Sequence, residues 1–302
     1  MIPALPEGLL PLLERQYGEQ TAARIVEGYG HRRPVTLRIN PLKADREEAL
    51  TQLRQVSPAL KQVSWYADAF ILPDCREDAV EALPVYQAGG VYLQSLSAML
   101  PALLLQPEKG KTVLDMAAAP GGKTTQIAAL TENKALITAC ERDAIRAERL
   151  KHNLQLQGAG RVSVMVQDAR RLDDFFSFDT ILLDAPCSGS GTILLTEGEK
   201  QRRMDPGWLK KTADTQAAML RKALKLLRPG GEMVYSTCSI LEMENEGVLR
   251  RVLPEFRAQV VPMQVPGTEI PLLPVTMQET LCVCPTELYE GFFVARIRKP
   301  KK

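Results

Sequence analysis

The chain of 302 residues has few cysteines and little net charge, and each of these features excludes some classes of protein. Six cysteines are too few for a disulfide-bonded scaffold, so we expect reduced thiols in a cytoplasmic protein. Excess charge is also small, because 38 lysines and arginines offset 36 aspartates and glutamates, and a net charge of +2 by itself indicates no partner. Hydrophobic residues (45%) and charged residues (25%) have the proportions of a folded protein, which excludes wholesale disorder.

Long apolar runs and metal-binding clusters are missing too. Residues 82–107 carry no acid or base, but glutamines and prolines interrupt the run, and its apolar pieces are too short to span a bilayer. The first residues lack the basic and then apolar stretches of a secretory signal. The only two histidines are far in sequence from Cys282 and Cys284, so the spacing gives no set of four zinc ligands. We expect a soluble monomer without a metal ion or a membrane partner.

The length is typical of about two domains, and the sequence pattern changes near residue 107. Apolar residues have helical spacing over Pro11–Val26, alternate as in a strand over Val35–Ile39, and resume helical spacing over Asp45–Leu53. This mixture predicts a small α+β domain over residues 1–107, followed by a larger domain over residues 108–302.

In the larger domain, apolar segments with the pattern of strands alternate with helical segments. Five segments have the length and composition of strands: Thr112–Met116, Ala135–Cys140, Val162–Val166, Phe178–Asp184 and Glu232–Ser236. Helical patterns follow the first strand to about Leu130, span Ala144–Gln157, and run from about Thr212 to the Arg228-Pro-Gly-Gly231 stop. The alternation predicts an α/β fold, a Rossmann-like, mainly parallel sheet covered by helices on both faces. Ligands of such sheets bind beyond the carboxyl ends of the strands.

The turn Ala117–Thr124, after the first strand, raises the question of which nucleotide it binds. A phosphate-binding loop needs the pattern Gly-x-x-x-x-Gly-Lys-Ser/Thr, so that backbone N–H groups surround the phosphates. Here Ala117 stands at the first glycine position, and Pro120 has no N–H to donate. However, Ile181–Asp184 resembles the apolar strand that ends in a magnesium-binding aspartate. A nucleotide hydrolase is therefore one alternative.

Four carboxylates at or just past strand ends favour S-adenosylmethionine instead: Asp115, Glu141, Asp168 and Asp184. This cofactor carries an amino group, a sulfonium and an adenosine, which need acidic partners and a close backbone approach at glycine. The turn after the first strand would hold the amino-acid moiety, Glu141 the ribose and Asp168 the adenine edge. Each acid alone could instead cap the next helix. Four at one edge favour the methyl donor.

Two of the cysteines follow strands at this same edge. Cys187 lies three residues after Asp184, and Cys238 lies two residues after Ser236, so adjacent parallel strands would bring both thiols into one cleft. The other four cysteines have no reactive context and resemble small buried hydrophobic residues. A thiolate that adds to carbon 6 of cytosine makes carbon 5 nucleophilic, and Asp184 could hydrogen-bond ring nitrogen 3. A nearby cation such as Lys123 would favour the ionised thiol. One thiol would attack and the other would assist release, but this chemistry does not decide which.

With these motifs the chain resembles the Nop/Sun family of RNA cytosine carbon-5 methyltransferases. The matching stretches are Asp115–Gln126, Asp184–Gly191, Tyr235–Ser239 with Glu244-Asn-Glu246, and Glu290–Arg296, with weaker matches over Arg38–Lys43 and Gly90–Gln94. They extend over nearly the whole chain, and the two cysteine motifs together are highly specific. The resemblance implies a Rossmann-like fold that binds S-adenosylmethionine.

Site residues are implied by the same resemblance. Besides Asp115, the donor would be bound by Ala117, Ala118, Ala119, Pro120, Gly121, Gly122, Lys123, Glu141, Asp168 and Asp184. Cys238 would be the nucleophile and Cys187 would assist product release, with Asp184 and Lys123 completing the catalytic set. The chain departs from the family over Ser95-Leu-Ser-Ala98, after Gln94, where relatives more often have an acidic residue and paired serines. It also ends soon after the core, so we expect a short form without the RNA-binding appendage of many relatives.

Clusters of basic residues are candidates for RNA contact. Residues 200–225 carry eight basic and two acidic side chains, a local charge of +6: Lys200, Arg202, Arg203, Lys210, Lys211, Arg221, Lys222 and Lys225 against Asp205 and Asp214. The other clusters are His31–Arg33 with Arg38, and the tail residues Arg296, Arg298, Lys299, Lys301 and Lys302. Any single cluster is as typical of a solvated helix face as it is of a surface that binds phosphate.

A buried thiol cannot reach a stacked base, so the target cytosine would be single-stranded or flipped out of structured RNA. Ribosomal RNA is favoured over transfer RNA. A non-catalytic RNA-binding assembly factor is a further alternative, against which the intact pair of cysteine motifs argues.

Overall fold

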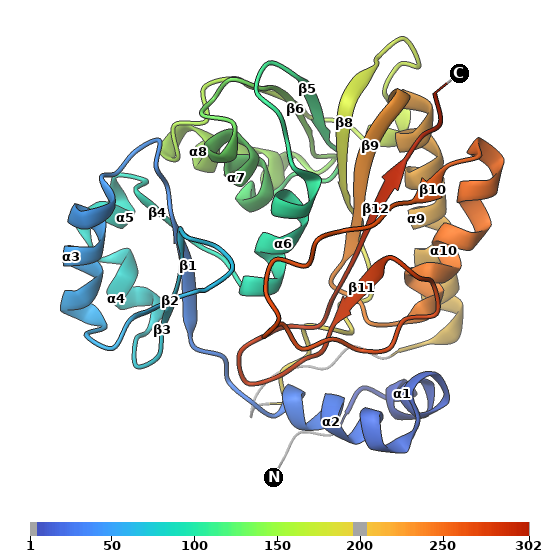
Figure 1. Cartoon of the computed structure of the whole chain (residues 1–302), viewed down its shortest axis with the longest axis horizontal. Helices are drawn as coiled ribbons and strands as arrows, with labels where there is room; N and C mark the ends of the chain where they lie inside the picture. The colour runs from blue at the N-terminus through green and yellow to red at the C-terminus, as the bar shows by residue number, and fades with distance from the viewer. Residues whose placement is uncertain (1–4, 196–203, 302) are drawn as a thin grey trace.

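The structure, a computed structural model, describes residues 5–195 and 204–301, which form two β-sheets (Figure 1). The smaller sheet has the order β2-β3-β1-β4, with strands β1 (Val35–Ile39), β2 (Lys61–Gln62), β3 (Ala69–Leu72) and β4 (Val91–Leu93). Helices α3 (Arg46–Val56), α4 (Glu77–Glu81) and α5 (Pro84–Gln87) belong to the same unit and share its hydrophobic core. The predicted strand over residues 35–39 and the helix that follows Asp45 are therefore confirmed.

The larger sheet has the order β10-β12-β9-β8-β5-β6-β7, with β11 paired to β12. Its parallel strands are β5 (Thr112–Asp115), β6 (Leu136–Cys140), β7 (Val162–Met165), β8 (Phe178–Asp184) and β9 (Leu227–Thr237). Its antiparallel edge consists of β10 (Gln259–Val260), β11 (Thr280–Val283) and β12 (Phe292–Arg298). The predicted Rossmann-like α/β fold is confirmed.

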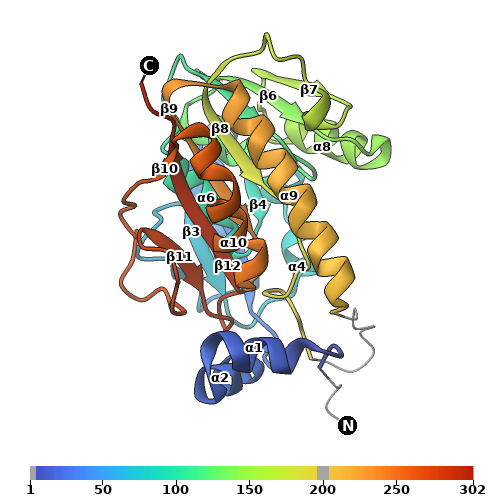
Figure 2. The ribbon, with the colours of Figure 1, turned by 90° about the vertical axis from the view of Figure 1, so that its right-hand side faces the viewer.

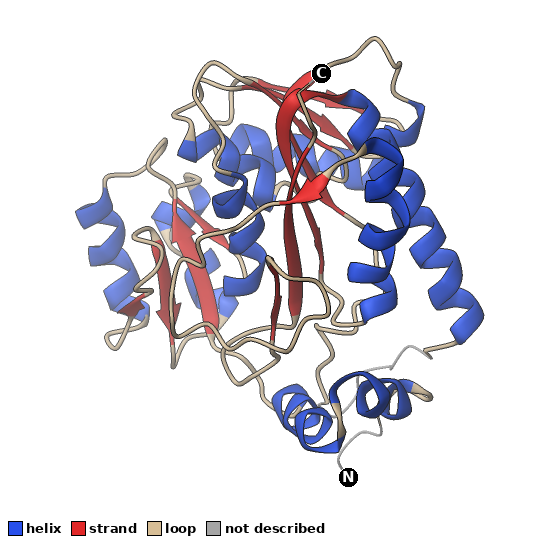
Figure 3. Cartoon of the chain, turned by 45° about the vertical axis from the view of Figure 1, so that its right-hand side comes forward, coloured by secondary structure: helices blue, strands red, loops and turns tan. Residues whose placement is uncertain are grey.

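Alternating side chains of this sheet belong to two hydrophobic cores. Val113 and Leu182 pack with α6 (Leu96–Leu105), α7 (Gly122–Leu130) and α8 (Ala144–Leu156). Leu114 and Leu183, one residue further along, pack with α9 (Pro206–Leu226) and α10 (Glu246–Val252). Figures 2 and 3 show the sheet between these layers of helices. Successive side chains of a strand point to opposite faces, so both faces of the sheet are buried.

Burial of helix α6 accounts for the lack of charge over Leu96–Leu105, within the uncharged run of residues 82–107. Nearly all of its residues are buried, and it packs against β8, β9 and β12 of the larger sheet as well as against α7. It lies on the N-terminal side of the predicted domain boundary at residues 107/108, which stays a prediction. The small sheet and the large sheet are thus linked by a helix that packs within the core of the larger one.

Two predicted helices have different bounds in the structure. The expected helix over residues 11–26 is two helices, α1 (Leu9–Tyr17) and α2 (Glu19–Tyr29), separated at Gly18, whose φ of 78° ends the first helix. Helix α9 begins at Pro206, earlier than Thr212, because the Asp205 side chain accepts a hydrogen bond from the Trp208 N–H at its N-terminus.

Among the residues that the structure describes, none of the helices has both the length and the apolar character needed to span a membrane.

The remaining helical elements are short 3₁₀ turns: η1 (Ala169–Arg171), η2 (Glu242–Glu244) and η3 (Leu253–Phe256).

Candidate active site

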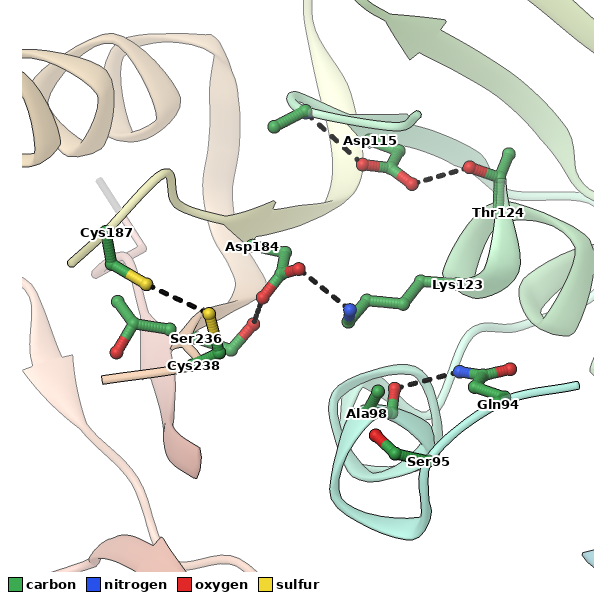
Figure 4. A network of polar contacts seen from close by, with 12 residues as sticks. Gln94, Ser95, Ala98, Asp115, Lys123, Thr124, Asp184, Cys187, Ser236 and Cys238 are labelled. Atoms are coloured by element: carbon green, nitrogen blue, oxygen red, sulfur yellow. Dashed lines mark hydrogen bonds and ion pairs between the residues drawn. The ribbon is translucent and has the colours of Figure 1, made fainter. Parts of the chain in front are cut away.

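The two predicted reactive thiols lie together at the carboxyl edge of the large sheet (Figure 4). Strands β8 and β9 are parallel neighbours, with Asp184 in register with Ser236. The loops that leave these strands carry Cys187 and Cys238, whose Sγ atoms are 3.2 Å apart. At this distance the thiol of one cysteine donates a hydrogen bond to the sulfur of the other.

The surroundings of Cys187 favour its neutral form. The hydrogen bond with Cys238 and burial of the side chain raise the pKa of the Cys187 thiol well above its ordinary value. The negative charge of Glu244 raises it further. Glu244 was not among the predicted site residues, although it lies in one of the motifs that carry the family resemblance.

Lys123 and Asp184 form an ion pair beside these thiols. Lys123 Nζ lies 2.7 Å from Asp184 Oδ2, and Ser236 Oγ donates a 2.8 Å hydrogen bond to Asp184 Oδ1. Burial would lower the pKa of Lys123, but Asp184, together with Asp115 and Cys238, raises it above its ordinary value. Lys123 Nζ also lies 5.4 Å from the centre of the Phe292 ring. Lys123 is therefore a cation that interacts with Asp184 and Cys238 at once.

Asp115 stabilises the turn between β5 and α7 through side-chain hydrogen bonds. Its side chain is only 1% exposed; Oδ2 accepts a 2.7 Å hydrogen bond from Thr124 Oγ1, and Oδ1 accepts a 3.4 Å bond from the Ala117 N–H. Burial raises the pKa of Asp115 to about 6, although the bond from Thr124 opposes this shift. The residue holds the turn in shape and does not itself line the cleft.

The turn that follows Asp115 presents only some of its residues to the cleft. Ala117 and Ala119 line it. Ala118 is buried, and exposed Pro120 accepts a hydrogen bond from Asn153 through its carbonyl. The turn ends at Gly121, whose φ of 111° favours glycine, and at Gly122, the first residue of α7.

On the far side of the turn, two predicted carboxylates are paired with arginines. Glu141 is 4% exposed; its Oε2 lies 3.3 Å from Arg146, and its Oε1 accepts a hydrogen bond from the Asp143 N–H. Asp168 forms a two-pronged ion pair with Arg170, and the hydrogen bonds of this pair lower the pKa of Asp168. Neither arginine was predicted to belong to the site.

Part of this set lines one cleft of about 590 Å³, whereas Asp115 and Lys123 are not among its lining residues. The predicted residues on its walls are Ala117, Ala119, Glu141, Asp168, Asp184, Cys187 and Cys238. Methionines of α9 and of the segment before it, Met219 and Met204, add an apolar wall that the sequence patterns did not indicate. The two cysteines and the two arginine-paired acids thus share one cavity.

The structure shows partners within the protein for several members of the predicted basic clusters. Lys200, Arg202, Arg203 and Lys302 lie outside the described residues. Arg221 pairs with Glu255, and Lys222 pairs with Asp174. In the tail, Arg296 and Arg298 both pair with Glu232 of β9, and Lys299 donates to the last carbonyl groups of α9. These side chains neutralise or cap neighbouring elements, and their contact with RNA stays a prediction.

One member of these clusters, Arg38, is a correction to the prediction, because it is completely buried. Its guanidinium donates hydrogen bonds to the Gly122 carbonyl (3.0 Å) and to Thr125 Oγ1 (2.6 Å), and it stacks on Tyr92. It therefore attaches the small domain to the N-terminus of α7, next to Lys123, and is not an exposed RNA contact.

Ser95, the first residue of the segment that departs from the family pattern, lies at the start of α6. Its hydroxyl donates a 2.6 Å hydrogen bond to Glu290, and Ser97 Oγ donates a 2.7 Å bond to the Glu290 carbonyl. A carboxylate supplied by the segment before β12 therefore lies at this helix N-terminus.

The fold and the cleft define a Rossmann-like α/β protein with a paired-cysteine site. Residues 102–298 match the family model described as 16S rRNA methyltransferase RsmB/F, and residues 5–76 match the ferredoxin-like domain of RsmF/B-like methyltransferases. The chain belongs to this family of rRNA methyltransferases, and the predicted resemblance is confirmed. Membership of this family favours a methyltransferase over the alternative of a nucleotide hydrolase.

Relatives in sequence and structure agree with this placement. The chain is 36% identical over 275 residues to ribosomal RNA small subunit methyltransferase F of Serratia proteamaculans (strain 568). The matched region covers 87% of this chain and 56% of the relative. It therefore spans about half the length of the curated relatives that it matches. A crystal structure of a methyltransferase homolog protein from Pyrococcus horikoshii is 32% identical, with a TM-score of 0.80 over 98% of this chain and 100% of that one.

A second solved structure, NSun6 from Pyrococcus horikoshii with SFG, has the same fold. Its TM-score is 0.87 at 23% identity, over 99% of this chain and 100% of that one.

Proposed function

We propose that this protein transfers a methyl group from S-adenosylmethionine to carbon 5 of a cytosine in ribosomal RNA, through a covalent adduct with Cys238. The observation that carries the proposal is the pair of sulfurs 3.2 Å apart, at the ends of adjacent strands and beside the ion pair of Lys123 and Asp184. A cytosine methyltransferase of this kind needs a nucleophile, a second group for release, and a polar partner for the base. The names of the sequence relatives support ribosomal RNA as the substrate class.

The cleft fits S-adenosylmethionine in volume and in chemistry. A volume of about 590 Å³ lies in the usual range of small-molecule sites, about 300–1,000 Å³. Glu141 would accept hydrogen bonds from the ribose hydroxyls, Asp168 would lie near the adenine, and the turn Ala117–Lys123 would hold the amino-acid moiety. When bound, this cofactor supplies the methyl group as an electrophile. The NSun6 protein, which has the same fold, was solved with SFG, and this is in line with a ligand at such a site.

The unequal charges around the two thiols support different roles for them. Lys123 interacts with Cys238, whereas the negative charge of Glu244 acts on Cys187. A cation favours the thiolate that attacks carbon 6, and an anion favours a neutral thiol. Asp184 is positioned by Lys123 and Ser236, which leaves its carboxylate at the edge of the cleft for the pyrimidine ring. The resemblance to the family and this asymmetry point to the same assignment.

The experiment that tests the proposal replaces one cysteine at a time. Cys238→Ala abolishes methyl transfer to small-subunit ribosomal RNA, because it removes the thiol that interacts with Lys123, yet donor binding measured by calorimetry is retained. Cys187→Ala accumulates protein covalently attached to RNA, visible as a slower band on a denaturing gel. Cys75→Ala, in the small domain, is the matched control and behaves like the wild type.

Each outcome discriminates between the alternatives. Unchanged transfer by Cys238→Ala would contradict the covalent mechanism. Equal RNA binding with no turnover in any variant, the wild type included, would favour the non-catalytic assembly factor. Bisulfite sequencing of RNA from cells with and without the protein identifies the modified cytosine and separates ribosomal from transfer RNA.

A further inference from the structure

A buried carboxylate connects the two cysteine loops. Glu244, at the end of η2, is 0% exposed and accepts four hydrogen bonds. Oε1 accepts from the Ser188 N–H (2.8 Å) and from Gln216 Nε2 (3.2 Å). Oε2 accepts from Ser188 Oγ and Ser239 Oγ, both at 2.5 Å. Ser188 follows Cys187 and Ser239 follows Cys238, so one side chain ties together the residues next to both thiols.

The hydrogen bonds fit an ionised carboxylate. The Ser188 N–H and Gln216 Nε2 can only donate, and the two serine hydroxyls complete the remaining acceptor positions. Within the described part of the chain, no lysine or arginine pairs with Glu244. A buried charge without an ionic partner is costly unless hydrogen bonds compensate it, and neutral donors do so here. Glu244 is therefore held by neutral donors and not by an ion pair with a lysine or arginine of the described residues.

The position of Glu244 is itself tightly determined. Its backbone carbonyl accepts a 2.6 Å hydrogen bond from the hydroxyl of Tyr235, a completely buried residue of β9. The serines that it binds are joined to one another through Ser190, whose Oγ lies 2.9 Å from Ser239 Oγ. Strand β9, η2 and the two cysteine loops thus form one hydrogen-bonded unit.

We infer that Glu244 is a positioning residue that keeps Cys187 as a neutral thiol whose S–H donates a hydrogen bond to Cys238 Sγ. The inference rests on the proposed roles of the two cysteines and adds a cause for them. A thiol that donates to Cys238 stabilises negative charge on that sulfur, both before it attacks the ring and when it leaves. The hydrogen bond with Cys238 and burial raise the pKa of Cys187 most, and the charge of Glu244 raises it further. Glu244 also sets the separation of the sulfurs, through its hydrogen bonds with Ser188 and Ser239.

The test measures how fast iodoacetamide alkylates Cys187 as a function of pH, by peptide mass spectrometry of the full chain without RNA or donor. Glu244→Gln, which removes the charge but keeps the shape, shifts the midpoint of the Cys187 curve to lower pH. Glu244→Asp retains the charge and keeps the midpoint, although its shorter side chain loosens the loops. Glu246→Gln is the matched control, because Glu246 is buried two residues away but hydrogen-bonds Thr276. Its midpoint equals that of the wild type.

Equal midpoints for Glu244→Gln and the wild type would overturn the inference, and so would an equal shift in Glu246→Gln. A second measurement does not depend on the folding of any Glu244 variant. The infrared difference between the wild type and Cys187→Ala near neutral pH contains the S–H stretching band of a hydrogen-bonded thiol; absence of this band also overturns the inference. Neither readout involves methyl transfer, so failure here is distinguishable from failure of the covalent mechanism, which the adduct gel decides.

Discussion

The two sides of the cleft hold their carboxylates in different ways. On the thiol side, Asp184 and Glu244 are bound by Lys123 and by neutral donors, most of them buried. On the side where we propose that the methyl donor binds, here called the donor side, Glu141 and Asp168 are paired with Arg146 and Arg170, whose side chains are 56% and 36% exposed. Exposed ion pairs contribute little energy and exchange readily, whereas buried networks hold one geometry. The thiol side is therefore assembled in advance, and the donor side can exchange arginine contacts for contacts with a ligand.

Among substitutions of the carboxylates, the largest effect is expected on the thiol side, from Asp184→Asn. The substitution removes the negative charge that pairs with Lys123 and the acidic group that we propose to interact with the pyrimidine ring, so methyl transfer falls by about 100- to 10,000-fold. Single-turnover transfer to ribosomal RNA measures the loss. Asp179→Asn is the control on the same strand, because Asp179 lies at the opposite end of β8, where its side chain accepts hydrogen bonds from Thr112. A loss of similar size in both variants would argue that the effect is structural.

Asp115, beneath the turn that joins the two sides, makes folding stability depend on pH. Its folded-state pKa of about 6 lies above the ordinary value of 3.8, so the folded protein binds this proton more tightly than the unfolded chain does. The contribution of this group to stability is thus fully present below about pH 4, declines as the pH rises to about 6, and is then constant, a change of about 3 kcal/mol.

Asp115→Asn removes this dependence, because the amide keeps the hydrogen bond with Thr124 but does not titrate. Urea unfolding of both proteins between pH 4 and pH 7 measures it: the variant gains stability relative to the wild type as the pH rises. A stability difference between the two proteins that is independent of pH would show that folding does not shift the pKa of Asp115.

A smaller effect is expected from Glu141→Gln on the donor side. Hydrogen bonds to a charged group contribute about 1.5–3 kcal/mol, so donor affinity falls by roughly 10- to 100-fold. Calorimetric titration with S-adenosylmethionine measures the change. Glu148→Gln on α8, an exposed residue paired with Lys151, leaves the affinity unaltered. If Glu141→Gln bound the donor as well as the wild type does, the ribose assignment would be wrong.

The smallest effect is expected from Arg146→Ala and Arg170→Ala. Exposed ion pairs are worth about 0–1 kcal/mol, so donor affinity changes by no more than about fivefold in either variant. The same titration at low and high salt detects it. A change as large as that of Glu141→Gln would mean that the donor side is as fixed as the thiol side, and the contrast between the two would be lost.

Much of this architecture could be predicted from local patterns. Strand β8 has the predicted bounds, and the alternation of strands and helices led to the parallel sheet. The positions of Cys187 and Cys238 just after strand ends led to their proximity, because neighbouring parallel strands end at one edge. The antiparallel edge was not predicted, since the apolar segment Phe292–Arg298 shows no sign of its direction in the sequence.

The roles of most charged residues could not be predicted in this way. Arg38 reads as one more basic residue in a cluster, yet it is buried between the small domain and α7. Arg296 reads as part of an unpaired tail, yet its acid, Glu232, is supplied by the neighbouring strand. Glu244 belongs to a family motif, but its contacts with Ser188 and Gln216 join segments far apart in sequence.

The order of elements and the residues at strand ends follow from side-chain periodicity, which a few neighbouring residues express. Which charge is neutralised, buried or free depends on distances between residues that only the folded chain brings together, because electrostatic attraction and the cost of desolvation act through space and not along the sequence.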